Sequence, residues 1–380
     1  MNFELTQDQK QIQALAREFA EKELAPGILE RDESGEFPLE LFKKFGKTGI
    51  YGYPHPKEAG GLGGSYLAYI LAVEEVSKVD GSFGIAFSVD TSLYGGSIMN
   101  SDAPMEIKKK FLEPITYGEK IGSFGLTEHT AGSDAAGQTT VATKDGDSYV
   151  LNGSKCFNTN GPLADLTVIY ALTDPALGTK GMAAFVVEKG TPGFTVGKLE
   201  NKMGIRTAQV SDMHLDNVRI PAENMIAAPG QGFKLAMKTL DGGRIGVAAQ
   251  GLGIAKGAFE IARKYMMERQ QFGKPISKQQ YLAFKMAELQ TKIQAAELLL
   301  WKAAQAKENG EPYSIPAAMA KLTCTNVAME VTTEAVQMLG GNGFMKEYHV
   351  ERMMRDAKIT QIYEGTNEIQ KLVISGPLFR

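Results

Sequence analysis

A single carboxylate near the end of the chain stands between an aromatic ring and a glycine. Glu364 follows Tyr363 and precedes Gly365 and Thr366. A carboxylate that the fold shields from water binds its proton more tightly, and it can then remove a proton from carbon as a general base near neutral pH. Because an isolated glutamate after a helix is more often a solvated side chain, the role of Glu364 depends on what the rest of the chain places around it.

Metal and disulfide chemistry find little support in the residues available. The two cysteines, Cys156 and Cys324, form no CxxC pair or Cys/His cluster, and no HExxH-like pair occurs. We therefore expect no metal site and a reducing compartment. His129 is a possible acid or base, but it is read more simply as a loop histidine. The other histidines are scattered at His55, His214 and His349.

Length and charge limit the classes of partner. The chain has 380 residues, enough for two or three domains. Its net charge of −3 comes from 41 basic and 44 acidic residues that are mixed along the sequence, so we expect neither nucleic acid nor membrane partners. The first residues lack the basic and apolar regions of a signal peptide, and no apolar run approaches about 18 residues. A cytoplasmic protein is expected.

Three stretches differ in hydrophobic period. Residues 1–120 read as helical, with Thr6 and Gln9 as a capping box, a first helix that Pro26 ends, a loop at 54–65 and a helix at 66–79. Residues 121–230 read as a small β-domain without βαβ alternation. Its expected strands are 139–143 and 149–151 around the Asp145-Gly146 turn, then 168–172, 183–187, 194–196 and 210–215.

Residues 231–380 read as a helical bundle. From Gly232 onward the pattern turns helical, and alanine- and leucine-rich segments predict helices around 245–269, 281–307, 315–339 and 347–359. The predicted fold is therefore α+β but mainly α, with an N-terminal helical domain, a middle β-domain and a C-terminal four-helix bundle.

An ordered set of motifs resembles the acyl-CoA dehydrogenase family of flavoproteins and spans nearly the whole chain. Within that family the segment 240–250 resembles short-chain, butyryl-CoA-type members. The motifs are Phe124-Gly125-Leu126-Thr127-Glu128, Ala131-Gly132-Ser133-Asp134, Leu151-Asn152-Gly153-Ser154-Lys155, Thr159-Asn160-Gly161, Met203-Gly204-Ile205-Arg206, Arg269-Gln270-Gln271-Phe272-Gly273-Lys274, Gln337-Met338-Leu339-Gly340-Gly341-Asn342-Gly343-Phe344 and Tyr363-Glu364-Gly365-Thr366.

The resemblance implies a role for Glu364. Desaturation of an acyl thioester removes a proton from Cα and a hydride from Cβ, so a base and a flavin must face opposite sides of the two carbons. The matching base is Glu364. In the isovaleryl-type branch the glutamate stands instead just before the arginine that is Arg244 here, and this chain has Gly243 at that place. The empty alternative position favours Glu364.

The resemblance also implies how FAD and substrate are bound. Asp241 and Arg244 would lie along the thioester tail, although an N-cap aspartate and a surface arginine are the simpler structural alternative. Tyr363 and Gly365 would flank the substrate, and Ser133 would touch the CoA portion at the edge of the cofactor site. The residues expected around the isoalloxazine ring are Phe124, Leu126, Thr127, Phe157 and Thr159, with Phe157 where many relatives have tryptophan.

The ADP half of FAD would be held by residues from two subunits. Arg269 can bind the pyrophosphate, and the Gly340-Gly341 pair permits close backbone approach. In the family these segments reach the FAD of a neighbouring chain, which implies a homotetramer built as a dimer of dimers. The full expected set is Arg269, Gln271, Phe272, Gln337, Gly340, Gly341, Thr366 and Glu368.

The resemblance therefore implies α,β-dehydrogenation of a short-chain acyl-CoA, with electrons exchanged with an electron-transferring flavoprotein. A branched-chain or glutaryl dehydrogenase, an oxidase, a nitroalkane oxidase and a non-catalytic flavin-binding relative are the alternatives. The physiological direction, oxidation or enoyl-CoA reduction, stays open.

Overall fold

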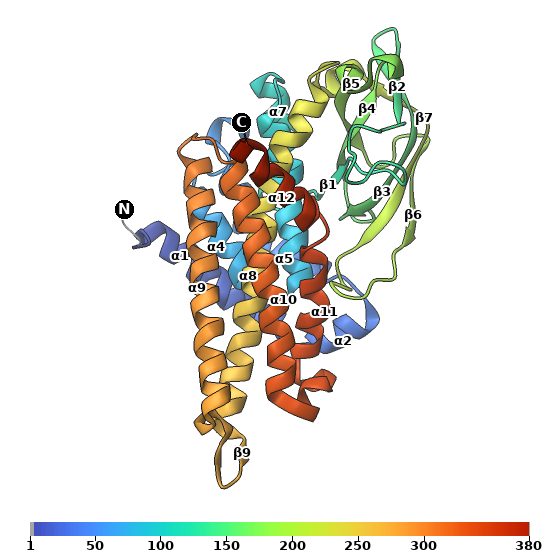
Figure 1. Cartoon of the computed structure of the whole chain (residues 1–380). Helices are drawn as coiled ribbons and strands as arrows, with labels where there is room; N and C mark the ends of the chain where they lie inside the picture. The colour runs from blue at the N-terminus through green and yellow to red at the C-terminus, as the bar shows by residue number, and fades with distance from the viewer. Residues whose placement is uncertain (1–3, 380) are drawn as a thin grey trace.

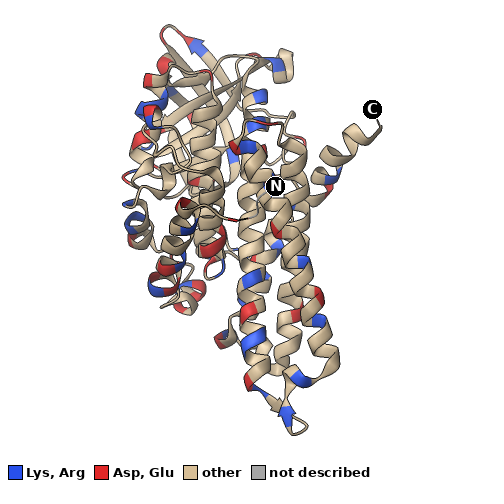
Figure 2. Ribbon diagram, turned by 90° about the vertical axis from the view of Figure 1, so that its left-hand side faces the viewer, with Lys and Arg blue, Asp and Glu red and all other residues tan. Residues whose placement is uncertain are grey.

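The computed structural model describes residues 4–379 and shows three parts in chain order (Figure 1). N-terminal helices are followed by a β-sheet and then by long helices, which confirms the mainly α architecture predicted from the sequence. Residues 1–3, part of the segment read for a signal peptide, lie outside the described residues. Acidic and basic side chains are interspersed along the ribbon (Figure 2).

The N-terminal helices form as the sequence predicts. Thr6 and Gln9 form the capping box, with backbone to side-chain hydrogen bonds of 2.9 and 3.2 Å. The predicted 66–79 helix is α4 (Tyr66–Ser77), which is buried along its whole length. A π-helical turn at Val89–Gly95 follows α5 (Gly81–Ser88). The remaining helices are α1 (Gln7–Phe19), α2 (Ile28–Ser34), α3 (Leu39–Gly46), α6 (Gly96–Asn100) and α7 (Met105–Thr116).

The middle part is one sheet with strand order β6-β7-β3-β2-β4-β5-β8, and β1 pairs with β4 in parallel. The predicted hairpin is confirmed, because β2 and β3 pair in antiparallel fashion around Gly146, which has φ 58°. The structure adds two short strands to the prediction, β1 and β8. The strands are β1 (Gly122–Gly125), β2 (Val141–Asp145), β3 (Ser148–Thr159), β4 (Leu166–Leu172), β5 (Met182–Glu188), β6 (Phe194–Leu199), β7 (Val210–Pro221) and β8 (Met225–Ala227).

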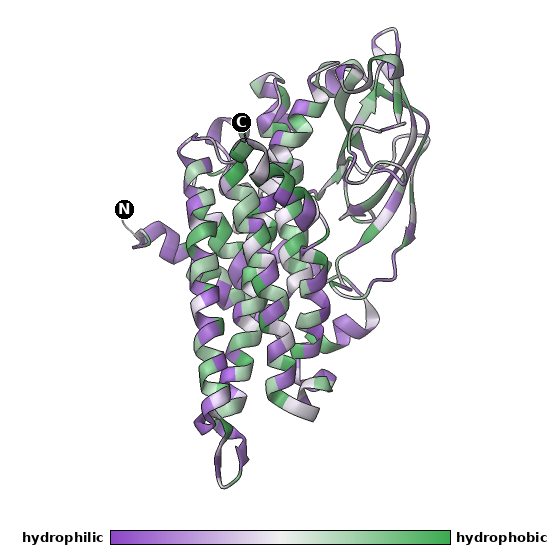
Figure 3. Cartoon of the chain, in the orientation of Figure 1, coloured by the Kyte–Doolittle hydropathy of each residue, from purple (hydrophilic) through white to green (hydrophobic). Residues whose placement is uncertain are grey.

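The C-terminal part contains the four predicted long helices and one further helix. The first begins at Gly232, where the sequence is expected to turn helical, and contains the predicted 245–269 segment except for its last residue. A two-stranded hairpin, β9 (Gln270–Gln271) and β10 (Lys274–Pro275), follows it. Figure 3 shows hydrophobic and hydrophilic positions alternating along these helices. They are α8 (Gly232–Glu268), α9 (Gln280–Glu308), α10 (Ser314–Leu339), α11 (Val350–Thr360) and α12 (Asn367–Ser375).

Glycines let α8 approach α4 closely. A Cβ on Gly253 would lie 2.3 Å from the carbonyl oxygen of Glu74, and one on Gly257 would lie 2.2 Å from that of Lys78. One large core consequently joins the N-terminal helices to the bundle, and a smaller core lies within the sheet. Over residues 4–379, the search for a membrane-crossing helix finds none with the required length and apolarity.

Candidate active site

A small apolar cluster lies where the three parts of the chain meet. Val89 and Leu93 come from the π-helical turn, Ile205 from the loop before β7, and Val247 from α8. Partly buried residues pack against them: Phe124, Leu240, Ile359 and Tyr363. The cluster gives the neighbouring Glu364 apolar surroundings of the kind that suit an acyl chain.

The turn that carries Glu364 is held by side chains that donate hydrogen bonds to its carbonyl groups. Glu364 and Gly365 both adopt left-handed backbone conformations, with φ of 52° and 89°. The carbonyl of Glu364 accepts from Arg244 Nε at 3.5 Å and from Gln370 Nε2 at 3.4 Å. The carbonyl of Gly365 accepts from Gln370 Nε2 at 2.7 Å and from Lys321 Nζ at 2.9 Å. Such a backbone persists only where its surroundings fix it.

The Glu364 carboxylate is withdrawn from solvent and has no partner. Oε1 and Oε2 are both buried, and neither accepts a hydrogen bond from any residue in 4–379. Burial raises the pKa of Glu364 to about 8, although the positive charges of Lys321 and Arg244 lower it in part. The alternative of a solvated loop side chain is therefore wrong for Glu364. An unpaired, buried carboxylate with a raised pKa can accept a proton from a ligand near neutral pH.

The space that a base on α8 would need is occupied by Glu364 itself. A Cβ on Gly243 would lie 1.9 Å from Glu364 Oε2 and 2.7 Å from Leu93 Cδ2. A side chain at position 243 and the Glu364 carboxylate would therefore occupy the same space, which agrees with the expectation that the base stands at one of these two positions.

Asp241 and Arg244 pair beside this turn. Arg244 is buried and its Nη1 donates to Asp241 Oδ1 at 2.6 Å. Asp241 lies inside α8, nine residues after Gly232, so the alternative reading of an N-cap aspartate and a surface arginine is wrong. Tyr363 donates its hydroxyl to Gln250 Oε1, while Gln250 Nε2 donates to the carbonyl of Gly81 at 2.8 Å. Arg244, Tyr363 and Gly365 therefore adjoin Glu364, and Asp241 pairs with Arg244 beside them.

The loop expected to meet the flavin is braced from behind by a buried ion pair. Lys155 Nζ donates to Glu128 Oε1 at 2.7 Å and to the carbonyl of Leu126 at 3.3 Å. Burial favours the neutral acid, but Lys155 and the hydrogen bonds from Thr139 and Thr140 outweigh it and hold the pKa of Glu128 at about 2. These bonds tie the Leu126–Glu128 loop to β3.

The aromatic side chain of Phe157 is presented outward from β3. It is 66% exposed, and its φ of 57° is unusual for a bulky residue. Phe124 lies on β1 and contacts Tyr170, with ring centroids 5.3 Å apart. Thr127 and Thr159 are partly buried. Both lie near Phe157, since Thr159 is on the same strand and the Thr127 carbonyl accepts a hydrogen bond from the backbone N–H of Cys156 at 2.8 Å. An exposed ring on a strained backbone makes Phe157 a candidate for a ligand contact.

The more peripheral loop residues remain at the surface. Ser133 is exposed. His129 is also exposed and its Nε2 lies 3.0 Å from Asp212 Oδ2, which fits its reading as a loop histidine.

Six of the eight residues expected at the ADP half of FAD lie at the opposite end of the bundle from α12 and the sheet, in and around the β9 hairpin and the end of α10 (Figure 1). Asn342 joins the two segments of this region, because its Nδ2 donates to Tyr265 Oη on α8 at 2.9 Å. One chain thus brings these residues together but does not bring them to Glu364. The exposed residues at this end are Arg269, Gln271, Phe272, Gln337, Gly340 and Gly341.

Thr366 and Glu368 lie at the start of α12. Thr366 Oγ1 accepts from the backbone N–H of Ile369 at 3.3 Å and so caps the helix. Glu368 is exposed, with Lys371 3.8 Å away. Neither shares the far end of the bundle with Arg269.

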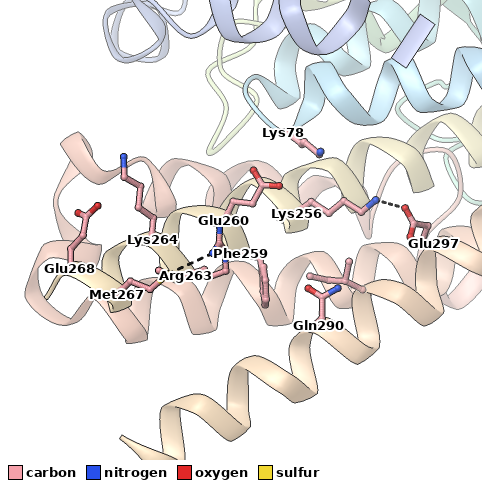
Figure 4. A pocket seen from close by; sticks show the side chains of 11 residues that line it. Lys78, Lys256, Phe259, Glu260, Arg263, Lys264, Met267, Glu268, Gln290 and Glu297 are labelled. Carbon is pink, nitrogen blue, oxygen red and sulfur yellow. Dashed lines mark hydrogen bonds and ion pairs between the residues drawn. The ribbon is translucent and has the colours of Figure 1, made fainter. Parts of the chain in front are cut away.

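A cleft of about 870 Å³ lies along the C-terminal half of α8, away from Glu364 (Figure 4). Its lining is mostly charged, and Lys256 is neutralised by Glu297 and by Glu74 at 2.6 Å. This cleft does not have the apolar lining that an acyl chain needs.

Two residues beside Glu364 escape prediction from the sequence. Lys321 lies on the buried face of α10, and Gln250 lies on the buried face of α8. In the sequence, each is a polar residue at a position where the helical period expects an apolar one. That pattern indicates a buried polar group but does not identify its partner.

The comparisons with known proteins agree with this geometry. Three family models match: "Acyl-CoA dehydrogenase, N-terminal domain" at residues 6–119, the middle domain at 123–218 and the C-terminal domain at 230–378. The chain is 54% identical over 380 residues to the short-chain specific acyl-CoA dehydrogenase of Clostridium acetobutylicum, with 100% of both covered.

Two solved structures are similar over the full length of both chains. Butyryl-CoA dehydrogenase from Megasphaera elsdenii matches with a TM-score of 0.98 and 50% identity. A chain in a structure on the electron transferring flavoprotein of Acidaminococcus fermentans and flavin-based electron bifurcation matches with a TM-score of 0.98 and 52% identity. The chain therefore belongs to the acyl-CoA dehydrogenase family.

Proposed function

We propose that the chain interconverts a short-chain saturated acyl-CoA, such as butyryl-CoA, and its trans-2-enoyl-CoA. The observation that carries this proposal is the Glu364 carboxylate, whose two oxygens are buried and unpaired against an apolar wall. In the oxidative direction Glu364 takes the Cα proton while the Cβ–H bond breaks on the opposite face of the substrate. Arg244 and Asp241 adjoin the turn and would bind the thioester tail, with Tyr363 and Gly365 beside the reacting carbons and Ser133 near the CoA portion.

The described residues fit a flavin. Phe157 offers an exposed ring on a strained backbone, and the Leu126–Glu128 loop is hydrogen-bonded to the preceding residues Lys155 and Cys156 of the same strand. FAD, when bound, supplies the hydride acceptor for the Cβ hydrogen. Phe124, Leu126, Thr127, Phe157 and Thr159 would hold its ring system.

The far end of the bundle supports a shared cofactor site. A Cβ on Gly340 or Gly341 would meet nothing within 4 Å, and the Phe272 ring is 92% exposed. An open backbone beside an arginine suits a pyrophosphate. We place the ADP half of FAD between this end of one chain and Thr366 and Glu368 of its neighbour, which requires a homo-oligomer, a dimer of dimers. Arg269, Gln271, Phe272, Gln337, Gly340 and Gly341 form this contact.

An electron-transferring flavoprotein is the proposed electron partner. The similarity to a chain in a structure on such a flavoprotein supports this choice, and both directions of reaction are compatible with it. We also propose a cytoplasmic location, which the two buried, unpaired cysteines suit, and domain boundaries at 1–120, 121–230 and 231–380.

Glu364→Gln tests the proposal. The amide keeps the shape of the side chain but cannot take a proton, so the variant should bind FAD and acyl-CoA and lose about 10²- to 10⁴-fold in kcat. The measurement is anaerobic bleaching of the yellow protein by butyryl-CoA. Glu347→Gln, at an exposed glutamate, is the matched control. Near-normal bleaching by Glu364→Gln would remove this residue from the mechanism, and a colourless purified protein would contradict the cofactor assignment.

A further inference from the structure

Lys321 carries a fully buried amine that contacts the Glu364–Gly365 turn. Its side chain is 0% exposed and emerges from a face of α10 that otherwise carries residues such as Ala317 and Cys324. Its Nζ donates to the Gly365 carbonyl at 2.9 Å and to Asn367 Oδ1 at 3.0 Å. Burying an ammonium group is costly unless it is hydrogen-bonded and faces a negative charge. The position of Lys321 therefore calls for a compensating carboxylate.

Glu364 is the carboxylate that compensates the buried amine of Lys321. Lys321 forms no ion pair within 4.0 Å in the described part of the chain, whereas Arg244 is already paired with Asp241 at 2.6 Å. Burial lowers the pKa of Lys321 to about 7, and of the negative charges that oppose this shift Glu364 has the largest effect, ahead of Glu368. Arg244 therefore has a close carboxylate partner of its own, whereas the carboxylate that acts most strongly on Lys321 is Glu364.

The groups that face Glu364 come from four elements and favour this view. Lys321 and Arg244 are the cations, and they come from α10 and α8. The other titratable groups around the carboxylate are phenols whose pKa values are raised by burial, so they stay neutral. These are Tyr66 and Tyr69 of α4 and the adjoining Tyr363.

Lys321 also fixes the backbone of the turn. The left-handed conformation of Glu364 is unfavourable for a residue with a side chain. Lys321 and Gln370 hold it by donating to the same Gly365 carbonyl, at 2.9 and 2.7 Å. The two tethers differ in charge, since the amide of Gln370 is neutral.

We propose that Lys321 is a positioning residue for the reaction: it anchors the Glu364–Gly365 turn and supplies the positive charge that makes the Glu364 carboxylate available as a base. This inference rests on the proposed role of Glu364 as the proton acceptor.

The test compares variants that separate charge from tether. In Lys321→Met the positive charge is lost, so the pH profile of kcat/KM should move to higher pH by about one unit, with about a tenfold loss of rate below its midpoint. Lys321→Arg retains the charge and should keep the profile near its original position. Gln370→Met removes the neutral tether to the same carbonyl and should lower kcat without moving the profile. An unmoved profile in Lys321→Met overturns the proposal.

A second readout does not depend on turnover. In the oxidised, FAD-loaded protein, the infrared band of the protonated Glu364 carboxyl, identified by its absence in Glu364→Gln, should disappear at higher pH in Lys321→Met than in the parent. If Glu364 is not the base, turnover survives in Glu364→Gln, while the infrared titration still reports whether Lys321 controls its proton. If Lys321→Met does not fold, Asn367→Asp places a carboxylate on the ammonium and should move the band the same way. A band that titrates identically in that variant also overturns the proposal.

Discussion

A methyl group on Gly243 should displace the proposed base without touching any other group in the reaction. The ideal Cβ would lie 1.9 Å from Glu364 Oε2, and ordinary contact begins near 3.4 Å, so the carboxylate must retreat by about 1.5 Å. A misplacement of about 1 Å costs roughly 10²-fold in rate. We therefore expect Gly243→Ala to lose at least about 10²-fold in kcat.

The neighbouring glycine gives a matched control. A Cβ on Gly242 would meet Lys307 Nζ at 2.5 Å, which is the far end of a flexible side chain. Both substitutions gain about 1 kcal/mol of helix propensity, and Gly243→Ala alone adds overpacking of about 1–3 kcal/mol against Leu93 and Glu364. Gly242→Ala should therefore keep its turnover and be the more stable of the two.

The assay measures turnover of butyryl-CoA together with flavin content and thermal unfolding. Loss of kcat with retained flavin and a folded protein is the expected result for Gly243→Ala. Full turnover in that variant would show that Glu364 need not occupy this space, and the geometric argument for the base would be refuted.

Three further outcomes follow from the same contacts and charges. Arg269→Ala should weaken FAD binding about tenfold or more through loss of a charge-assisted bond, measured as flavin retained after dialysis, with exposed Lys264→Ala as control; equal retention would contradict the phosphate role. The parent's kcat/KM should rise with pH toward about 8 as Glu364 loses its proton, and a flat profile from pH 6 to 9 would count against this base. Because the pKa of Glu364 is raised on folding, its contribution to stability is fully present below about pH 4.5 and is lost as pH rises through about 8. In chemical denaturation Glu364→Gln should consequently exceed the parent in stability by up to a few kcal/mol at pH 8 and match it at pH 4; equal stability at both pH values would argue against a buried acid.

Local signals account for much of the fold. The capping box at Thr6, the hairpin at Gly146 and helix α4 all follow from a few adjacent residues, and each forms as predicted. The helical pattern expected from Gly232 onward is α8. Gly242 and Gly243 weaken the helical signal within it, and close packing of α8 against α4 and the π-helical turn is what glycine permits there.

The site shows the same division between local and long-range information. The motif around Glu364 identifies the carboxylate, yet its burial depends on residues more than a hundred positions away, such as Arg244. Nothing in the sequence around Lys321 indicates that its ammonium reaches the Gly365 carbonyl, because that contact exists only once α10 packs against the turn. The sequence does not predict helix α12, because its cap, Thr366, belongs to the Tyr363–Thr366 motif. The domain boundaries and the roles of individual site residues stay predictions.

The separation of the hairpin end from Glu364 has a consequence for mixed populations of subunits. If each cofactor is shared as proposed, a chain damaged only near Arg269 keeps its own acid group intact and disables the pocket of its neighbour instead. The defect would act in trans, and a minority of defective subunits would inactivate active sites in oligomers whose other subunits are intact. Conversely, a chain that lacks only Arg269 and a chain that lacks only Glu364 would form some active sites with both residues when they assemble together.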